Sequence, residues 1–322
     1  MLTLSRRAAF GAAAAMLAAP RIATAQGTAI RIVVPFGPGG STDAVARLVA
    51  PGVGAKLGAN VVVENRSGAA GSIGADIVAK ARPDGLTWML TFDSHATIPA
   101  LLRNPPFDVL TDLEPVMLIG GSPYAAACKP DKPHRTMADA VAAAKARPDG
   151  VSYGSTGNGT IGHLTMILLG DRAQARMQHV PYRSGGLAVN DAVAGHVDMM
   201  IGSAALMLPH ITGGSLRPLL QFGPTRLAGL AQTPTAAEIG FAGMEAEAWW
   251  AVFAPHGTQA AQVARMNAAI RETLQEERAN RMMTETQQAR LVLSSPEELG
   301  TFFARQVAQW GGIVRANNIQ PD

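Results

Sequence analysis

Residues 30–43 read IRIVVPFGPGGSTD and describe a strand, a turn and the start of a helix. The run Ile30–Val34, in which every residue except Arg31 is β-branched, is typical of a buried strand. The segment Gly37–Gly40 then ends that strand, and Ser41 or Thr42 can cap the helix that follows. A strand that leads through a short turn into a helix is the first half of a βαβ unit. The stretch therefore predicts a parallel sheet covered by helices.

The same alternation continues on both sides of a loosely patterned middle segment. Strands at 61–63 and 86–92, with a helix at 73–81 between them, complete a first βαβαβ unit. A second alternating run follows, and two helices close the chain. The expected helices are 137–147, 162–169, 187–193, 260–276 and one that begins at the capping box Ser295–Glu298, and the expected strands are 151–153, 179–180, 197–201 and 216–221.

Two extended crossings are expected to join these α/β units. Residues 116–119 and 124–128 look extended on either side of Gly120-Gly121, and residues 249–253 can return to the first unit. Two lobes joined by two crossover strands make a hinge and a cleft, an arrangement that suits a small ligand. The expected division is a first lobe of residues 26–123 with 248–322, and a second lobe of residues 124–247.

Composition excludes several classes of protein. The 322 residues are 48% hydrophobic and 16% charged, which is unlike a disordered tail, and no apolar run reaches the roughly 18 residues of a membrane span. Three of the 27 Lys and Arg residues lie in residues 1–25, which contain no acid, so 24 bases face 24 acids in the remainder. No nucleic-acid partner is therefore expected. Cys128 is the only cysteine, which excludes an internal disulfide and a cysteine-rich metal site.

Residues 1–25 have the pattern of an export signal. Arg6 and Arg7 precede the apolar run Ala8–Ala19, and Ala23-Thr24-Ala25 matches a small-x-small cleavage site. We expect cleavage after Ala25, with export by the twin-arginine or the general secretory route. The mature protein is therefore expected in the periplasm.

Two glycine-rich loops can bind an anion through their backbone. Phe36–Asp43 and Gly154–His163 each lie between an expected strand and an expected helix, where glycine lets the backbone approach a ligand and the helix N-terminus offers unpaired N–H groups. The alternative for each loop is a tight turn with an ordinary cap. Gly157-x-Gly159-x-x-Gly162 also matches a dinucleotide fingerprint, but the acid expected about 20 residues onward is missing, which disfavours a nucleotide.

The sequence offers no evident catalyst. It contains no Gly-x-Ser-x-Gly elbow and no His-Glu-x-x-His motif, and its seven histidines are scattered, so neither a metal nor a cofactor is expected. A purely structural role is the alternative to ligand contact for His163, and a capping or solvated role is the alternative for Asp191. A Ser–His–Asp triad stays open, because its members need not be adjacent in sequence.

Several segments together resemble one family of receptors. They are VPFGPGGSTD at 34–43, VENRSGAAG at 63–71, AKARPDG at 79–85, YGSTG at 153–157 with His163-Leu164, HVPYR at 179–183, GHVD at 195–198, PTAAEIG at 234–240 and APHGT at 254–258. The chain thereby resembles the substrate-binding receptors of tripartite tricarboxylate transporters, also called Bug receptors, over nearly its whole length after residue 25. The resemblance implies a two-lobed, type II-like periplasmic binding-protein fold. It also implies that main-chain N–H groups and ordered waters hold a small carboxylate, with aromatic and amide-like ligands in some members.

The resemblance also implies which residues bind the ligand. They are Phe36, Gly39, Gly40, Ser41, Thr42 and Asp43 in the first loop, Ser155, Thr156, Gly157 and His163 in the second, and Asp191 near the bound waters. The chain departs from the family at Asp93-Ser94-His95, where a stretch rich in small residues before Asn-Pro is usual. Ser94 and His95 follow a strand end that faces the expected cleft, so we expect them to tune specificity.

These observations predict an exported solute-binding receptor that performs no chemistry. We expect it to be a monomer that captures a small mono- or dicarboxylate, aromatic acids included, and delivers it to membrane permease subunits. One alternative is a sensor whose closed form contacts a two-component sensor kinase. A third hypothesis is an exported hydrolase that uses a serine in the cleft.

Overall fold

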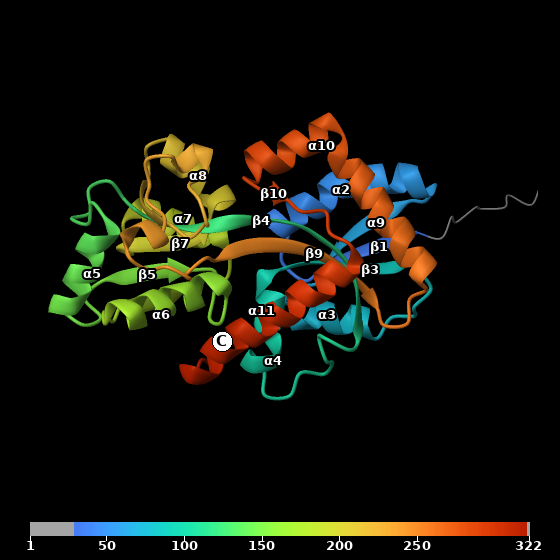
Figure 1. Cartoon of the computed structure of the whole chain (residues 1–322), viewed down its shortest axis with the longest axis horizontal. Helices are drawn as coiled ribbons and strands as arrows, with labels where there is room; N and C mark the ends of the chain where they lie inside the picture. The colour runs from blue at the N-terminus through green and yellow to red at the C-terminus, as the bar shows by residue number, and fades with distance from the viewer. Residues whose placement is uncertain (1–28, 321–322) are drawn as a thin grey trace, which may run out of the picture.

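The computed structural model describes residues 29–320, and it confirms the two α/β lobes expected from the sequence (Figure 1). The expected export signal, residues 1–25, lies outside the described residues. In the part of the chain from 29 to 320, no helix is both long and apolar enough to cross a bilayer.

The first lobe begins with three parallel strands and the helices between them. β1 pairs in parallel with β2 on one side and with β3 on the other, as the βαβαβ pattern predicted. The elements are β1 (Ile30–Val34), α2 (Ser41–Leu57), β2 (Val61–Asn65), α3 (Ser72–Ala79), β3 (Thr87–Phe92) and α4 (Ile98–Leu101), with 3-10 turns η1 (Ala69–Gly71) and η2 (Asp93–Thr97).

The second lobe repeats this arrangement. β5 pairs in parallel with both β6 and β7. Its elements are α5 (Met137–Ala146), β5 (Ser152–Ser155), α6 (Ile161–Ala173), β6 (Gln178–Pro181), α7 (Gly185–Ala194), β7 (Met199–Ser203), α8 (Ala204–Thr212) and β8 (Arg217–Gln221). Helix α8 was not among the elements expected from the sequence. The Ser203 side chain caps α8, and Pro209 lies inside it.

Two long strands connect the lobes. β4 (Leu113–Cys128) and β9 (Glu247–Pro255) run antiparallel and side by side between the two lobes (Figure 1). The sequence suggested two extended segments around Gly120-Gly121, whereas β4 is one continuous strand. Gly120 makes room for β10 (Arg290–Leu291), which passes so close that a Cβ at Gly120 would lie 2.4 Å from the Arg290 carbonyl oxygen.

The C-terminal segment crosses from one lobe to the other. α9 (Ala260–Gln275), α10 (Glu277–Arg281) and the π-helical turn η5 (Met282–Thr286) precede β10, and α11 (Pro296–Ala316) follows it. α11 begins at the capping box expected at Ser295 and Glu298. Phe303 near its start packs in the first lobe's core with Phe253, whereas Trp310 packs in the second lobe's core with Tyr124. The helix therefore spans the junction (Figure 1).

Candidate ligand-binding site between the lobes

The strand register brings the parallel strands of the two lobes end to end. Phe92 at the end of β3 pairs with Trp250, which pairs with Gly120 of β4. Ser203 at the end of β7 pairs with Tyr124 of the same strand. β3 runs parallel to β4, and β7 runs antiparallel to β4, so the carboxyl ends of β3 and β7 face each other. Along β4 these two ends are separated by four residue steps, from Gly120 to Tyr124, or about 13 Å. Ligands of α/β proteins bind at such carboxyl ends.

The first glycine-rich loop follows β1 and is braced from inside. The Asp43 carboxylate accepts hydrogen bonds from the Gly39 N–H and from Arg47 Nε, both at 3.0 Å. Asn65 Nδ2 donates to the Phe36 carbonyl at 3.1 Å and to Asp43 Oδ1 at 3.0 Å. Burial raises the pKa of Asp43, but the bonds from Arg47, Gly39 and Asn65 outweigh it and hold the pKa below its usual value. Asp43 therefore shapes the loop.

The second glycine-rich loop follows β5 and is organised by two histidines. Gly159 N–H donates to His163 Nδ1 at 3.0 Å, and Ser155 Oγ lies 2.7 Å from His179 Nε2. The two imidazole rings stack with centroids 3.7 Å apart. Burial, followed by the nearby His163, lowers the pKa of His179 to about 3. Ser155 Oγ also accepts the Gly157 N–H at 3.2 Å, so its contacts stabilise the turn.

The helices that follow these two loops have open N-termini. No side chain caps α2 or α6, which begin after Gly40 and Thr160. Serine or threonine side chains cap α5, α7, α8 and α11, whereas α3, α4, α9 and α10 also lack a side-chain cap. No N-cap side chain therefore covers the first-turn N–H groups of α2 and α6 where the two lobes meet, although the Gly162 N–H of α6 also donates to the Tyr124 hydroxyl. Such groups, at the positive end of a helix dipole, can bind a carboxylate.

An aromatic row lies between the first loop and the crossover strands. The Phe36 ring meets the Phe92 ring edge-on with centroids 6.3 Å apart, and Phe92 lies 5.9 Å from Trp250. Gly71 allows Phe36 to approach η1, because a Cβ there would lie 3.3 Å from the Phe36 ring. Phe92 packs against core clusters of both lobes. The row therefore forms an apolar wall where the lobes meet.

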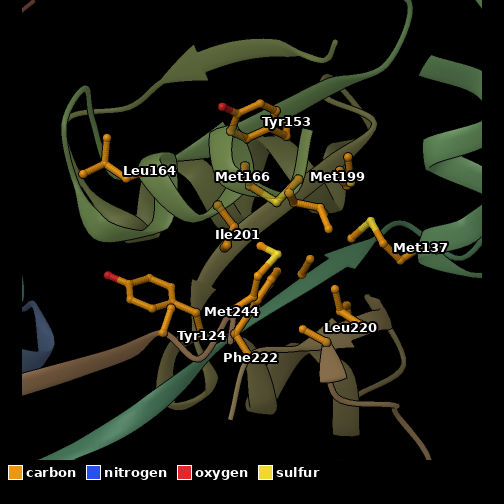
Figure 2. Close-up of a cluster of buried hydrophobic side chains, with 14 of the residues drawn as sticks. Tyr124, Met137, Tyr153, Leu164, Met166, Met199, Ile201, Leu220, Phe222 and Met244 are labelled. Atoms are coloured by element: carbon orange, nitrogen blue, oxygen red, sulfur yellow. The ribbon is translucent and has the colours of Figure 1, made fainter. Parts of the chain in front are cut away.

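A buried carboxylate–tyrosine pair joins the lobes, and neither residue was among the candidates from the sequence. The Tyr124 hydroxyl donates to Asp93 Oδ2 at 2.6 Å. Figure 2 shows Tyr124 at the edge of the second lobe's core with its hydroxyl directed away from the methionines. Burial raises the pKa of Asp93 to about 7, against the hydrogen bond from Tyr124. An acid directly after an apolar strand was the available signal, but a single sequence does not reveal its partner.

The remaining candidates lie in different surroundings. Ser94 is buried in η2, and its carbonyl accepts the Thr97 hydroxyl at 2.8 Å. His95 lies in the first lobe's core, where its ring stacks on Phe107 and Phe303, and burial lowers its pKa to about 3. Asp191 lies on α7. Its carboxylate accepts the Tyr182 hydroxyl at 2.7 Å, and His196 Nδ1 is 3.2 Å away.

The structure thus places the second loop against the first lobe, while Phe36 of the first loop contacts Phe92, the residue before η2. α6 lies against η2, and Gly159 of the second loop lies against Leu101 of α4, where a Cβ would be 2.7 Å from the leucine. Within residues 29–320, no group of three His, Cys, Asp or Glu side chains is arranged to hold a metal ion. The geometry fits a small anion held by backbone N–H groups beside an apolar wall.

Comparison with known proteins points to one family. Residues 45–319 match one protein family, described as the tripartite tricarboxylate transporter family receptor. Protein BugT of Bordetella pertussis is 36% identical over 288 residues, which cover 89% of this chain and 88% of BugT.

Solved structures agree with this match. The periplasmic binding protein BugD superposes with a TM-score of 0.82 at 29% identity, over 91% of this chain and 98% of BugD. An R. palustris protein with adipate has a TM-score of 0.84 at 30% identity, over 91% and 98% of the two chains. MatC from Rhodopseudomonas palustris, with bound malate, has a TM-score of 0.81 at 27% identity, over 89% and 98%. These similarities confirm the expected two-lobed periplasmic binding-protein fold.

Proposed function

Since this chain belongs to the tripartite tricarboxylate transporter receptor family, a family of solute-binding receptors, we propose that it captures a small organic carboxylate between its lobes. One observation carries the proposal. The uncapped N-termini of α2 and α6 follow glycine-rich loops at strand ends that face each other along β4.

The chemistry of the two loops favours an anion bound by the backbone. Residues 36–43 and 154–163 contain no lysine or arginine, and the nearby Arg47 is engaged by Asp43. A carboxylate would therefore accept hydrogen bonds from first-turn N–H groups, which are stronger to a charged acceptor than to a neutral one. The structural neighbours with adipate and with bound malate support a small carboxylate as the ligand class.

Ligand capture would shift an equilibrium between open and closed lobes. β4 and β9 form the hinge, and a ligand that contacts both loops binds the closed form better than the open form. We propose that the protein is exported to the periplasm, works as a monomer, performs no chemistry, and delivers its ligand to permease subunits. The family match and the likeness to periplasmic BugD support this assignment.

Isothermal titration calorimetry on the protein from Gln26 onward tests the proposal. The panel contains mono-, di- and tricarboxylates, including adipate and malate, and the matched neutral diamides and sugars serve as controls. We expect at least one carboxylate class to bind with a 1:1 stoichiometry while the neutral controls do not. A folded protein that binds none of the carboxylates, or that prefers the neutral controls, would contradict the proposed function.

A further inference from the structure

Asp93 is a buried acid with one oxygen unpaired. The residue is 1% exposed, and its Oδ2 accepts the Tyr124 hydroxyl at 2.6 Å. Oδ1 is shielded from solvent and has no hydrogen-bond partner among residues 29–320. Buried polar atoms are nearly always paired in native proteins, because an unpaired one loses its bonds to water without replacement. Above its pKa of about 7, Asp93 is ionised and its oxygens accept without donating, so the group that pairs with Oδ1 must then be a donor.

The position of Asp93 places this acceptor at the proposed ligand site. It is the first residue after β3, whose end faces the end of β7 along β4. Its partner Tyr124 touches the first turn of α6, where a Cβ at Gly162 would lie 3.0 Å from the tyrosine ring. On the other side, the preceding Phe92 contacts Phe36 of the first loop. A ligand whose carboxylate binds the helix N-termini would therefore extend its far end toward Asp93.

The charges around Asp93 disfavour a second carboxylate there. Residues 90–97, 120–124 and 154–163 contain no lysine or arginine that could neutralise two acids. A ligand carboxylate beside Asp93 would place two like charges in a site shielded from water, where their repulsion is poorly screened. An amide, ammonium or hydroxyl group in the same place would instead donate to Oδ1.

We propose that Asp93 selects ligands that carry one carboxylate and, at the opposite end, a hydrogen-bond donor. This inference rests on the proposed function and narrows its ligand class. The carboxylate binds the backbone N–H groups of α2 and α6, and the donor pairs with Asp93 Oδ1. The receptor rejects the corresponding dicarboxylate, because specificity follows from an unfavourable contact as well as from a favourable one.

Matched ligand pairs test the proposal by calorimetry at about pH 8, where Asp93 is ionised. The pairs are adipate with its monoamide, and succinate with its monoamide, so that length is constant and only the far group changes. We expect the wild-type protein to bind a monoamide at least about tenfold more tightly than its diacid. Equal or tighter binding of the diacid would overturn the proposal and leave the proposed function intact. Failure of every probe to bind would contradict both.

Asp93→Asn separates the role of this residue from that of the rest of the site. The amide side chain is isosteric and can donate to a carboxylate, so we expect the preference for the monoamide to disappear or reverse in this variant. Asp131→Asn, which removes an exposed acid of the second lobe, is the charge control and should keep the wild-type preference. Circular dichroism verifies folding of each variant. If folded Asp93→Asn retained the wild-type preference, Asp93 would not be the selecting residue. The wild-type comparison tests the ligand class even if the variant fails to fold.

Discussion

The Tyr124 hydroxyl donates a 2.6 Å hydrogen bond to Asp93 Oδ2, and this bond ties the end of β3 in the first lobe to β4 at its entry into the second. Both side chains are buried, so the bond is shielded from competing water. It lies at the carboxyl end of β3 and beside the first turn of α6, so the fold and the proposed site depend on the same pair.

Removing the Tyr124 hydroxyl should destabilise the protein. Tyr124→Phe leaves an ionised buried carboxylate without its donor, which costs about 1–3 kcal/mol at pH 8. Urea unfolding followed by circular dichroism measures the change. Tyr182→Phe is the matched control, because that hydroxyl bonds the half-exposed Asp191 and its loss should cost less than about 1 kcal/mol. Equal losses of unfolding free energy in the two variants would show that the buried Tyr124–Asp93 bond stabilises the protein no more than the partly exposed Tyr182–Asp191 bond.

The stability of the protein should carry a pH signature from Asp93. Burial raises the pKa of this group from 3.8 to about 7, so between these values the folded state holds a proton that the unfolded state has released. The contribution of Asp93 to the free energy of unfolding is therefore present below about pH 4. It is lost as the pH rises through 7, by up to about 4 kcal/mol. Asp93→Asn should gain stability relative to wild type over this window. A pH-independent difference between the two proteins would contradict the assignment.

The imidazole of His163 should shape the second loop. Its Nδ1 accepts the Gly159 N–H, and its ring stacks on His179. His163→Phe keeps a ring for stacking but has no acceptor, so we expect carboxylate affinity to fall by about tenfold. His163→Asn retains an acceptor near the Nδ1 position and should lose less. Calorimetry with one ligand from the panel compares the two, and a greater loss in His163→Asn would mean that stacking matters more than the loop bond.

The first-turn N–H of α2 can be deleted without changing the helix. Ser41 is the first residue of α2, and Gly40 before it has φ −79° and ψ 170°, an extended backbone that also suits the residue before a proline. Ser41→Pro removes the N–H, whereas Ser41→Ala removes only the hydroxyl. We expect Ser41→Pro to weaken carboxylate binding about tenfold and Ser41→Ala to weaken it less.

The exposed Ala260 begins α9 and provides the control for the proline itself. Ala260→Pro should leave binding unchanged, since this helix follows the opposite end of β9. If Ser41→Pro bound the ligand as tightly as the wild-type protein, the α2 N-terminus would not hold the carboxylate.

Local sequence was a good guide wherever neighbours in the chain set the structure. The run Ile30–Val34 and the glycines after it correctly predicted β1, its loop and α2, and the capping box at Ser295 correctly predicted the start of α11. Local patterns failed at α8, where Pro209 lies within a helix whose start Ser203 caps. They also failed at Gly120, where the approach of β10 explains the glycines inside a strand.

The sequence by itself determined the two lobes, their alternating elements and the two glycine-rich loops, because periodicity, turns and caps involve residues only a few positions apart. The tertiary structure alone decided where side chains point and what they meet. Asp43 turns inward to brace its own loop, and the His95 ring stacks in a core built by α11. Asp93 meets Tyr124, 31 residues away, because the register of β3, β9 and β4 aligns them. Such register follows from packing and hydrogen bonding between distant strands, which local patterns do not encode.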